Sequence, residues 1–392
     1  MITYHHALDI IAKLDPVVGS IELPLNESHG SRLADDIEAP IDSPRFTNSA
    51  MDGFAVPSTL MTGSQAKILT TVAAESFSDL PKPQPNSCIR IMTGAPLPDG
   101  YDAVIPVEQT KIINDSTVEF PEPLEPMKHI RVQGEDIREG ETILAAGEQL
   151  NAAKMLLLSS MGISKVPTTD QIRVGIITTG NELTPPGVPL KPGMIYNSNQ
   201  SFLEAAIKEL GLPIVYNRTI GDDPELAVSQ IQKVFAKPGT LLITTGAVSA
   251  GIKDFIPNLA GDLGFRTIFH KVLVRPGKPV FLASNGESYW LGLPGNPIST
   301  LTGWYYFARP LLKSIALIPE PEKFSVIIST GTKKPKNFRC FYRGIVSEGQ
   351  ASLIGSQSSG HLRSLAEANA LLELPEELEY VNQGKIVSAI RI

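Results

Sequence analysis

The chain has 392 residues and a formal net charge of −7, a length that accommodates two to four domains of roughly 100–200 residues each. Apolar residues make up 42% and charged residues 19%, which excludes a wholly disordered chain and a coiled coil. The net negative charge and the absence of a long run of basic residues argue against non-specific nucleic-acid binding. No apolar run approaches the roughly 18 residues of a membrane span.

The first 170 residues predict two kinds of structure. A helix from His6 to Lys13 and a strand over residues 20–25 come first. Residues 41–126 then place short apolar runs between proline-rich turns, as in a small all-β module. Residues 131–170 contain a helix-like run, for which we expect Asn151 to be the N-cap and Gly162 to be the C-cap.

Residues 171–316 change to an alternation of strands and helices. Apolar strands are predicted at 172–177, 213–220 and 240–243, and helices at 198–210 and 224–236. This order predicts βαβ units, a parallel sheet and an α/β sandwich. Residues 317–392 return to period-two alternation and end in a strand at 385–392, which predicts a small barrel or sandwich.

Cysteine, histidine and proline usage narrows the class of protein. Cys88 and Cys340 stand far apart, which argues against a disulfide framework; with no secretory signal at the first residues, we expect a reducing, cytoplasmic location. The six histidines form no HExxH-type pair, so we expect no His-ligated zinc site. The 32 prolines exceed the roughly 20 of an average chain of this length, and we expect them to stiffen particular turns.

One short sequence recurs where two of the predicted strands end. Residues 176–180 (Ile-Ile-Thr-Thr-Gly) return as 242–246 (Leu-Ile-Thr-Thr-Gly), and ligands of open α/β sheets bind beyond the carboxyl ends of the strands. The small residues over 244–251 could cradle a phosphate before a helix, or could form a plain strand-to-helix turn. They do not form a Walker motif, because the GK[ST] element is missing.

Two proline-rich turns are further candidates for anion binding. Residues 275–279 (Arg-Pro-Gly-Lys-Pro) hold two cations in a rigid turn, which suits an oxyanion, although a solvated hairpin tip is the alternative. Residues 292–299 open a predicted helix, with an anion site as the second interpretation.

Scattered carboxylates could cap turns or, where several meet at a phosphate, bind Mg²⁺. They are Asp52, Asp136, Glu182, Asp222, Asp223 and Asp254. The residues alone therefore indicate a protein that handles phosphate or an oxyanion, with metal dependence left open.

Six ordered segments together carry a resemblance to a known family. They are residues 49–53, 90–95, 134–137, 179–183, 275–279 and 292–297. With them the chain, from about residue 5 to 390, resembles the MoeA family of molybdopterin molybdenumtransferases, to which gephyrin is related.

The resemblance implies a multidomain α/β and β protein with a central three-layer α/β/α domain of the molybdopterin-binding type. It implies a discontinuous N-terminal α/β domain (1–40 plus 127–170), an inserted β domain (41–126), the α/β/α domain (171–316) and a C-terminal β-barrel (317–392).

The resemblance also implies a reaction. The family inserts molybdate into adenylylated molybdopterin, which releases AMP and forms molybdenum cofactor with Mg²⁺ support. A cytoplasmic homodimer is implied, with the active site completed across the interface, and a molybdopterin adenylyltransferase is a candidate partner. Alternatives are the preceding adenylylation step, a non-catalytic gephyrin-like scaffold and an inactive paralogue.

Site residues are carried over by their positions in the matching segments. The implied catalytic residues are Asp254, Glu182, Asp222, Asp52 and Asp136, of which Asp254 and Glu182 are the metal ligands. The implied substrate-binding residues are Thr93, Thr245, Gly246, Ser249 and Pro297. The implied molybdate-binding residues are Arg275, Lys278, Pro294, Arg343 and Ser364.

Three departures from the family pattern bear on these assignments. Ala247 stands where a second glycine is frequent, and Arg275 where lysine is more usual. The irregular spacing over 338–343 leaves open whether Arg339 or Arg343 contacts molybdate.

Overall fold

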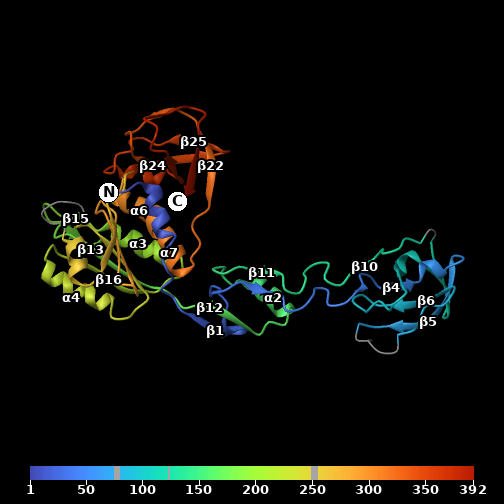
Figure 1. Ribbon diagram of the computed structural model, residues 1–392. Coiled ribbons are helices and arrows are strands. Elements are labelled where there is room, and N and C mark those ends of the chain that lie inside the picture. Colours follow the sequence, from blue (N-terminus) through green and yellow to red (C-terminus); the bar gives the residue numbers. More distant parts are fainter. Residues whose placement is uncertain (75–79, 122–123, 249–254) are drawn as a thin grey trace. The chain divides into compact units, whose positions relative to one another are not determined.

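A computed structural model describes residues 1–74, 80–121, 124–248 and 255–392 (Figure 1). The chain divides into two compact units, Met1–Ile21 with Pro167–Ile392, and Glu22–Val166. In the described part of the chain no helix has the length and apolar character needed to cross a membrane. The four domain boundaries expected from the resemblance stay a prediction.

The unit Glu22–Val166 contains a six-stranded sheet, in agreement with the expected β module. Its strand order is β7-β4-β6-β5-β9-β8. The strands are β4 (Gly53–Val56), β5 (Gln65–Val72), β6 (Ser87–Ile91), β7 (Ala103–Pro106), β8 (Lys111–Asn114) and β9 (Thr117–Glu119). Side chains alternate between two cores, with Phe54 and Val118 in one and Ile89 and Val104 in the other.

The same unit has a third core, which joins distant parts of the chain. Leu33 and Ile37 pack with Leu144 and Leu158. Short pairs support it: β2 (Ile37–Glu38) with β11 (Thr142–Leu144), and β3 (Asn48–Ser49) with β10 (Ile130–Arg131). Helix α2 (Ala152–Ser160) contributes Leu158 to this core. Strand β1 (Ser20–Pro24) pairs with β12 (Lys165–Thr169), and both strands include residues on each side of the unit boundaries.

The predicted N-cap of α2 is confirmed, whereas its C-cap is Met161, one residue before the predicted Gly162. The Asn151 side chain accepts the backbone N–H of Lys154, with 3.0 Å between nitrogen and oxygen. Gly162 follows the C-cap residue with φ +76°, the left-handed conformation that terminates many helices.

The other unit contains the expected three-layer domain. Its sheet has the order β16-β13-β17-β21-β20-β18. The first four strands are parallel, β20 pairs antiparallel with β21, and β18 pairs antiparallel with β20. The strands are β13 (Arg173–Thr179), β16 (Ile214–Ile220), β17 (Thr240–Thr245), β18 (Arg266–His270), β20 (Phe281–Ser284) and β21 (Tyr289–Leu293). A short parallel pair, β14 (Leu183–Thr184) with β15 (Ile195–Tyr196), lies outside this sheet.

Helices cover both faces of this sheet (Figure 1). One core takes apolar side chains from α1 (Tyr4–Ile11), α3 (Ser198–Lys208), α6 (Pro297–Gly303) and α7 (Arg309–Ala316). The opposite core takes them from α4 (Pro224–Val234) and α5 (Ile256–Asp262). Helix α1 begins two residues before its predicted start because the Thr3 side chain caps it, accepting the His6 N–H at 3.2 Å.

The C-terminal region forms a closed barrel rather than a sandwich. Its five strands pair in a ring of order β24-β25-β22-β28-β26, and β26 pairs back to β24. They are β22 (Lys323–Ile328), β24 (Arg339–Ser347), β25 (Gln350–Leu353), β26 (Ala370–Leu374) and β28 (Ile386–Arg391). Two short strands, β23 (Thr332–Lys333) and β27 (Tyr380–Val381), pair separately.

Strand β24 connects the barrel to the three-layer domain. Cys340 and Tyr342 belong to the barrel core, whereas Phe341 between them packs in the core that contains α1 and α7. On its edge, β24 pairs in parallel with β19 (Val274–Arg275). Side chains at 339, 341 and 343 therefore share the face opposite the barrel interior.

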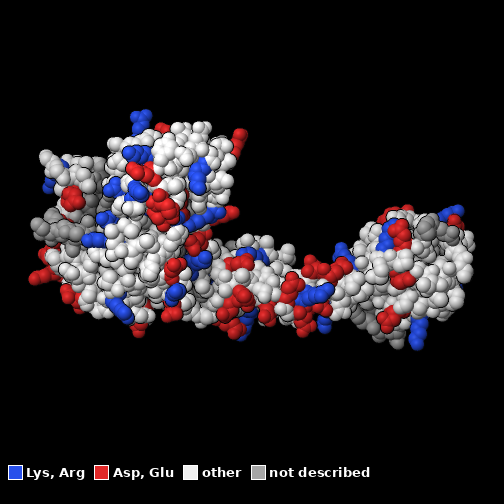
Figure 2. Space-filling model, turned by 45° about the horizontal axis from the view of Figure 1, so that its top comes forward, with Lys and Arg blue, Asp and Glu red and all other residues white. Residues whose placement is uncertain are grey.

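On the face drawn in Figure 2, Lys and Arg side chains are interspersed with Asp and Glu side chains over both units. That face presents no broad basic surface of the kind that binds nucleic-acid backbones.

Candidate functional site

The two repeated sequences meet at one edge of the parallel sheet. Strands β13 and β17 are neighbours, with Thr178 opposite Thr245, and each strand runs through both threonines of its repeat. The glycines that follow, Gly180 and Gly246, line a cavity of about 460 Å³. We call this cavity the phosphate-type cleft. It is also lined by Glu182, Asp222, Thr245, Gly295, Asn296 and Pro297.

At two positions of the cleft a side chain would have to displace a neighbouring group. Gly246 has φ +89°, and a Cβ there would lie 2.5 Å from the Thr179 Oγ1 atom. A Cβ at Gly180, where φ is +146°, would lie 2.8 Å from both carboxylate oxygens of Glu182. The Glu182 carboxylate is therefore seated against bare backbone. Ala247 has φ +53°, a conformation in which glycine is less strained, which accounts for the second glycine of the family pattern.

The loop before α6 forms one wall of the cleft. Asn296 caps α6 by accepting the Ile298 N–H at 3.1 Å. Asn199, on the first turn of α3, donates to the Gly295 carbonyl at 2.7 Å and also lines the cleft. Sequence reasoning missed Asn199, although a polar residue on the first turn of the predicted 198–210 helix was an available signal. Asp223 caps α4, where it accepts the Glu225 N–H at 2.9 Å.

A second cavity, the cation cavity, lies where the 275–279 turn meets the barrel. Its volume is about 630 Å³, and its lining includes Arg275, Lys278, Ser299, Tyr342, Gln357 and Ser358. Both cations are exposed. Burial raises the pKa of Tyr342 to about 12, so its hydroxyl stays protonated at neutral pH. Pro294 is buried in the turn before α6 and lines neither cavity among the described residues.

Arg343 lies directly behind the wall of the cation cavity. Its Nε donates to the Ser364 hydroxyl at 2.6 Å, and its Nη2 donates to the carbonyls of Ser356 and Ser358. The side chain is fully buried, and Nη1 has no hydrogen-bond partner among the described residues. Gln357 fixes this arrangement with two hydrogen bonds to the Arg343 backbone, at 2.8 and 2.9 Å.

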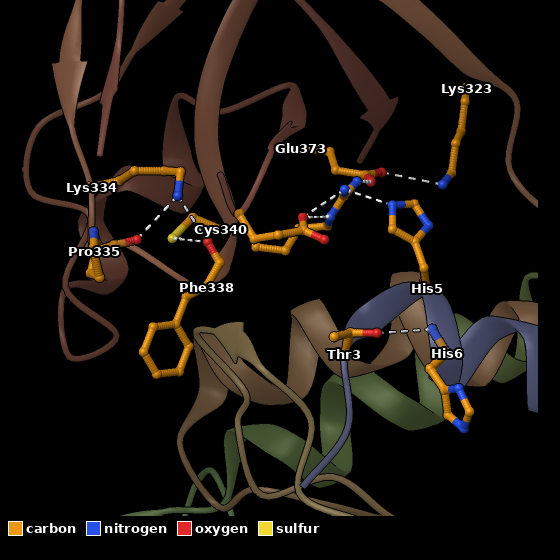
Figure 3. Close-up of polar contacts among 11 residues, drawn as sticks. Thr3, His5, His6, Lys323, Lys334, Pro335, Phe338, Cys340 and Glu373 are labelled. Carbon is orange, nitrogen blue, oxygen red and sulfur yellow. Dashed lines mark hydrogen bonds and ion pairs between the residues drawn. The ribbon is translucent and has the colours of Figure 1, made fainter. Parts of the chain in front are cut away.

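Arg339 has a different set of partners, of which His5 and Glu373 are labelled in Figure 3. It forms ion pairs with Glu373 and Glu376 and donates to the His5 Nε2 atom of α1 at 2.7 Å. Glu373 is also paired with Lys323 at 3.2 Å. Arg339 thus joins the first helix to the barrel. Neither arginine left open by the sequence is in the lining of the cation cavity, but the Arg343 guanidinium donates to Ser358, which lines it.

In the unit Glu22–Val166, two predicted site residues contact each other. The Asp52 Oδ1 atom accepts both the backbone N–H of Thr93 at 2.7 Å and its hydroxyl at 2.8 Å. Asp52 is exposed and Thr93 is exposed. Asp136 is also exposed and lies on a separate turn, where its N–H donates to the Ser43 carbonyl at 3.0 Å. Ser249 and Asp254 lie outside the described residues.

Because of these contacts, the pKa of Asp52 reports whether its hydrogen bonds with Thr93 are formed. The Thr93 backbone N–H, followed by its hydroxyl, lowers the pKa of Asp52. The charged form is therefore favoured, and this stabilisation is lost as pH falls through the lowered pKa. Thr93→Val keeps the backbone bond and is expected to raise the Asp52 pKa part of the way back, measured by NMR titration of the carboxyl carbon. Thr93→Ser should leave it unchanged; an unshifted pKa in the valine variant would contradict the assignment.

The fold and the two cavities define a multidomain α/β and β protein with a phosphate-type cleft beside a cation cavity. Three family models match the chain: the MoeA N-terminal region (domain I and II) over residues 2–162, a probable molybdopterin binding domain over 175–314, and the MoeA C-terminal region (domain IV) over 325–392. The chain belongs to the MoeA family.

Similar proteins agree over almost the whole length. Molybdopterin molybdenumtransferase 2 of Mycobacterium tuberculosis is 36% identical over 96% of each chain, and the molybdopterin molybdenumtransferase of Synechococcus elongatus is 34% identical over 98% of each. The crystal structure of the molybdopterin biosynthesis MoeA protein from Pyrococcus horikosii has a TM-score of 0.79 and 29% identity, covering 100% of this chain and 99% of that one.

Proposed function

We propose that this chain is an enzyme that inserts molybdate into adenylylated molybdopterin, releasing AMP and forming molybdenum cofactor. One observation carries the proposal beyond family membership: the start of α6 separates the two cavities. Pro297 lines the phosphate-type cleft, and Ser299, two residues later, lines the cation cavity. A substrate phosphate and an incoming oxyanion could therefore be held side by side. The names of the relatives favour insertion over adenylylation or a scaffold role.

In the phosphate-type cleft, we assign substrate binding to the loop after β17 and to the α6 wall. Thr245, Gly246 and Pro297 contribute directly, and Ser249 and Asp254 follow a few residues along the chain. The tight backbone at Gly246 lets a phosphate approach main-chain N–H groups without a side chain intervening.

The donor set of this cleft fits Mg²⁺. The carboxylates of Glu182 and Asp222 line it together, and Mg²⁺ takes one or two carboxylates plus waters and substrate phosphate oxygens. When bound, the ion would neutralise negative charge that develops on the phosphate oxygens. We assign Asp254 and Glu182 as its ligands, with Asp222 supporting them.

In the cation cavity, we assign molybdate binding to Arg275, Lys278 and Arg343. Three cations suit a tetrahedral dianion, and the Arg343 Nη1 atom is a buried donor still lacking a partner in the described structure. Ser364 accepts from Arg343 and donates to the His361 carbonyl at 3.1 Å, so it orients the arginine. Pro294 shapes the turn between the cavities.

We further propose that Asp52, Thr93 and Asp136 serve the cleft of a second copy in a cytoplasmic homodimer. Their support is the resemblance and their exposure, since the hydrogen-bonded Asp52–Thr93 pair is open to solvent. A molybdopterin adenylyltransferase is the partner that we expect to supply the substrate.

The function is tested by incubating the chain with adenylylated molybdopterin, Mg²⁺ and molybdate and measuring AMP. We expect AMP release to depend on both molybdate and Mg²⁺. AMP release at the same rate without molybdate would reject insertion.

Lys278→Ala is expected to raise the molybdate concentration for half-maximal AMP release about tenfold or more, because a charge-assisted contact to the anion is lost. The maximal rate should change less. Lys191→Ala, at an exposed lysine that lines neither cavity, is the matched control. An unchanged molybdate dependence in Lys278→Ala would remove Lys278 from the pocket.

A further inference from the structure

The guanidinium of Arg275 lies over an aromatic ring that itself is not part of the cavity lining. Its Cζ atom is 5.1 Å from the centroid of the Phe338 ring. The two residues are held in register because β19 pairs in parallel with β24, with Val274 opposite Arg339 and Arg275 opposite Cys340. Arg275 lines the cation cavity, whereas Phe338 contacts the Arg275 guanidinium without lining the cavity. Phe338 is the residue immediately before β24.

The position of Phe338 is fixed by a buried lysine. Lys334, 2% exposed, donates from Nζ to the carbonyls of Pro335 at 3.1 Å and Phe338 at 2.9 Å (Figure 3). The Cys340 thiol also points to the Phe338 carbonyl. The ring itself is half-buried against the barrel core. One ammonium group thus closes the 334–338 turn and holds Phe338 beside the cavity.

Contact with an aromatic face suits a guanidinium that must also bind an anion. The N–H donors of arginine lie in the plane of the group and fan outward from Cζ, so a guanidinium whose Cζ lies over a ring can still direct N–H groups to an anion. Phe338 can therefore restrict Arg275 without using the donors that an oxyanion needs. An exposed arginine otherwise loses rotamer entropy when it binds, and prior restriction reduces that loss.

We propose that Phe338 is a positioning residue, which holds the Arg275 guanidinium at the cation cavity and thereby strengthens oxyanion binding. The proposal rests on the proposed function, since molybdate is the oxyanion concerned. It also gives a physical reason for arginine at 275, because lysine has no planar group to lie against the ring.

Phe338→Leu tests this by removing the ring while keeping an apolar side chain. Half-saturation for molybdate in AMP release is expected to rise about three- to tenfold, as for loss of a partly desolvated cation–π contact. The maximal rate should stay within about twofold. Phe338→Tyr, which retains the aromatic face, should behave as the unmodified protein. Thermal unfolding checks that each variant is folded, and Phe338→Met provides a second ring-free variant.

A double-mutant cycle separates positioning from a general structural effect. In an Arg275→Ala background, Phe338→Leu should have no further effect on molybdate half-saturation. An equal rise in molybdate half-saturation in both backgrounds would overturn the proposal, as would no rise in Phe338→Leu and Phe338→Met. In either case, AMP release that still depends on molybdate would leave the proposed function intact. If AMP release by the unmodified protein ignores molybdate, both proposals fall.

Discussion

Arg339→Met is expected to lower the free energy of unfolding of its unit by about 3 kcal/mol, the usual cost of removing one partner of a buried ion pair. The loss arises because Glu373, 8% exposed, keeps its charge with Lys323 as its remaining ion-pair partner among the described residues. Helix α1 also loses its contact through His5. Denaturation followed by circular dichroism measures the change. Molybdate half-saturation of the folded variant should remain within about twofold.

The paired substitution Arg339→Met/Glu373→Leu should recover most of the stability, because apolar replacements of a whole buried ion pair are often neutral. Arg343→Met is expected instead to raise molybdate half-saturation tenfold or more. It should also lose stability, because its buried hydrogen bonds to Ser364, Ser356 and Ser358 are removed, so molybdate half-saturation is what separates the two arginines. If Arg339→Met were stable and instead required more molybdate, the assignment of the two arginines would be reversed.

Asp254→Ala is expected to reduce AMP release at least about 100-fold while adenylylated molybdopterin still binds. Loss of a metal ligand removes charge stabilisation at the phosphoanhydride, and stabilisation of developing charge contributes strongly to enzymatic rate enhancement. Single-turnover AMP release measures the step, and calorimetric titration of the substrate measures binding. Asp262→Ala, an exposed aspartate at the end of α5, is the matched control. Full activity in Asp254→Ala would remove this carboxylate from the mechanism.

Mixing two inactive variants tests the composite site. Asp254→Ala and Asp52→Ala, combined and allowed to exchange subunits, should regain about a quarter of the activity, since half of the dimers would be mixed and each would hold one intact site. No regained activity after demonstrated exchange would place Asp52 and Asp254 in the same subunit's site. Full activity of Asp52→Ala by itself would remove Asp52 from the site.

Much of the fold could be predicted from the sequence, because helix caps and strand ends are determined by residues close together in the chain. Asn151 caps its helix as expected, and Gly162 follows the C-cap Met161, one residue beyond the expected position. The repeated Thr-Thr-Gly sequences meet because parallel strands end at one edge of a sheet. The choice between barrel and sandwich was left open, since it is decided by the pairing of β24 with β26, which lie far apart along the chain.

The candidate site was less predictable where partners come from distant segments. Nothing near Arg339 indicates that it meets His5 at the other end of the chain. The sequence pattern indicates only that Phe338 lies in or next to a strand. Its contact with Arg275 arises because β19 pairs with β24 and places the guanidinium over the ring. Likewise, Asn199 contributes to the cleft only because Gly295 lies against α3.

The most direct test of molybdate insertion is to measure AMP released and molybdenum bound to molybdopterin in the same reaction. If the two cavities serve one insertion reaction, one molybdenum atom should be incorporated for each AMP, and both should disappear without molybdate. AMP release that proceeds without molybdenum incorporation would contradict the central claim.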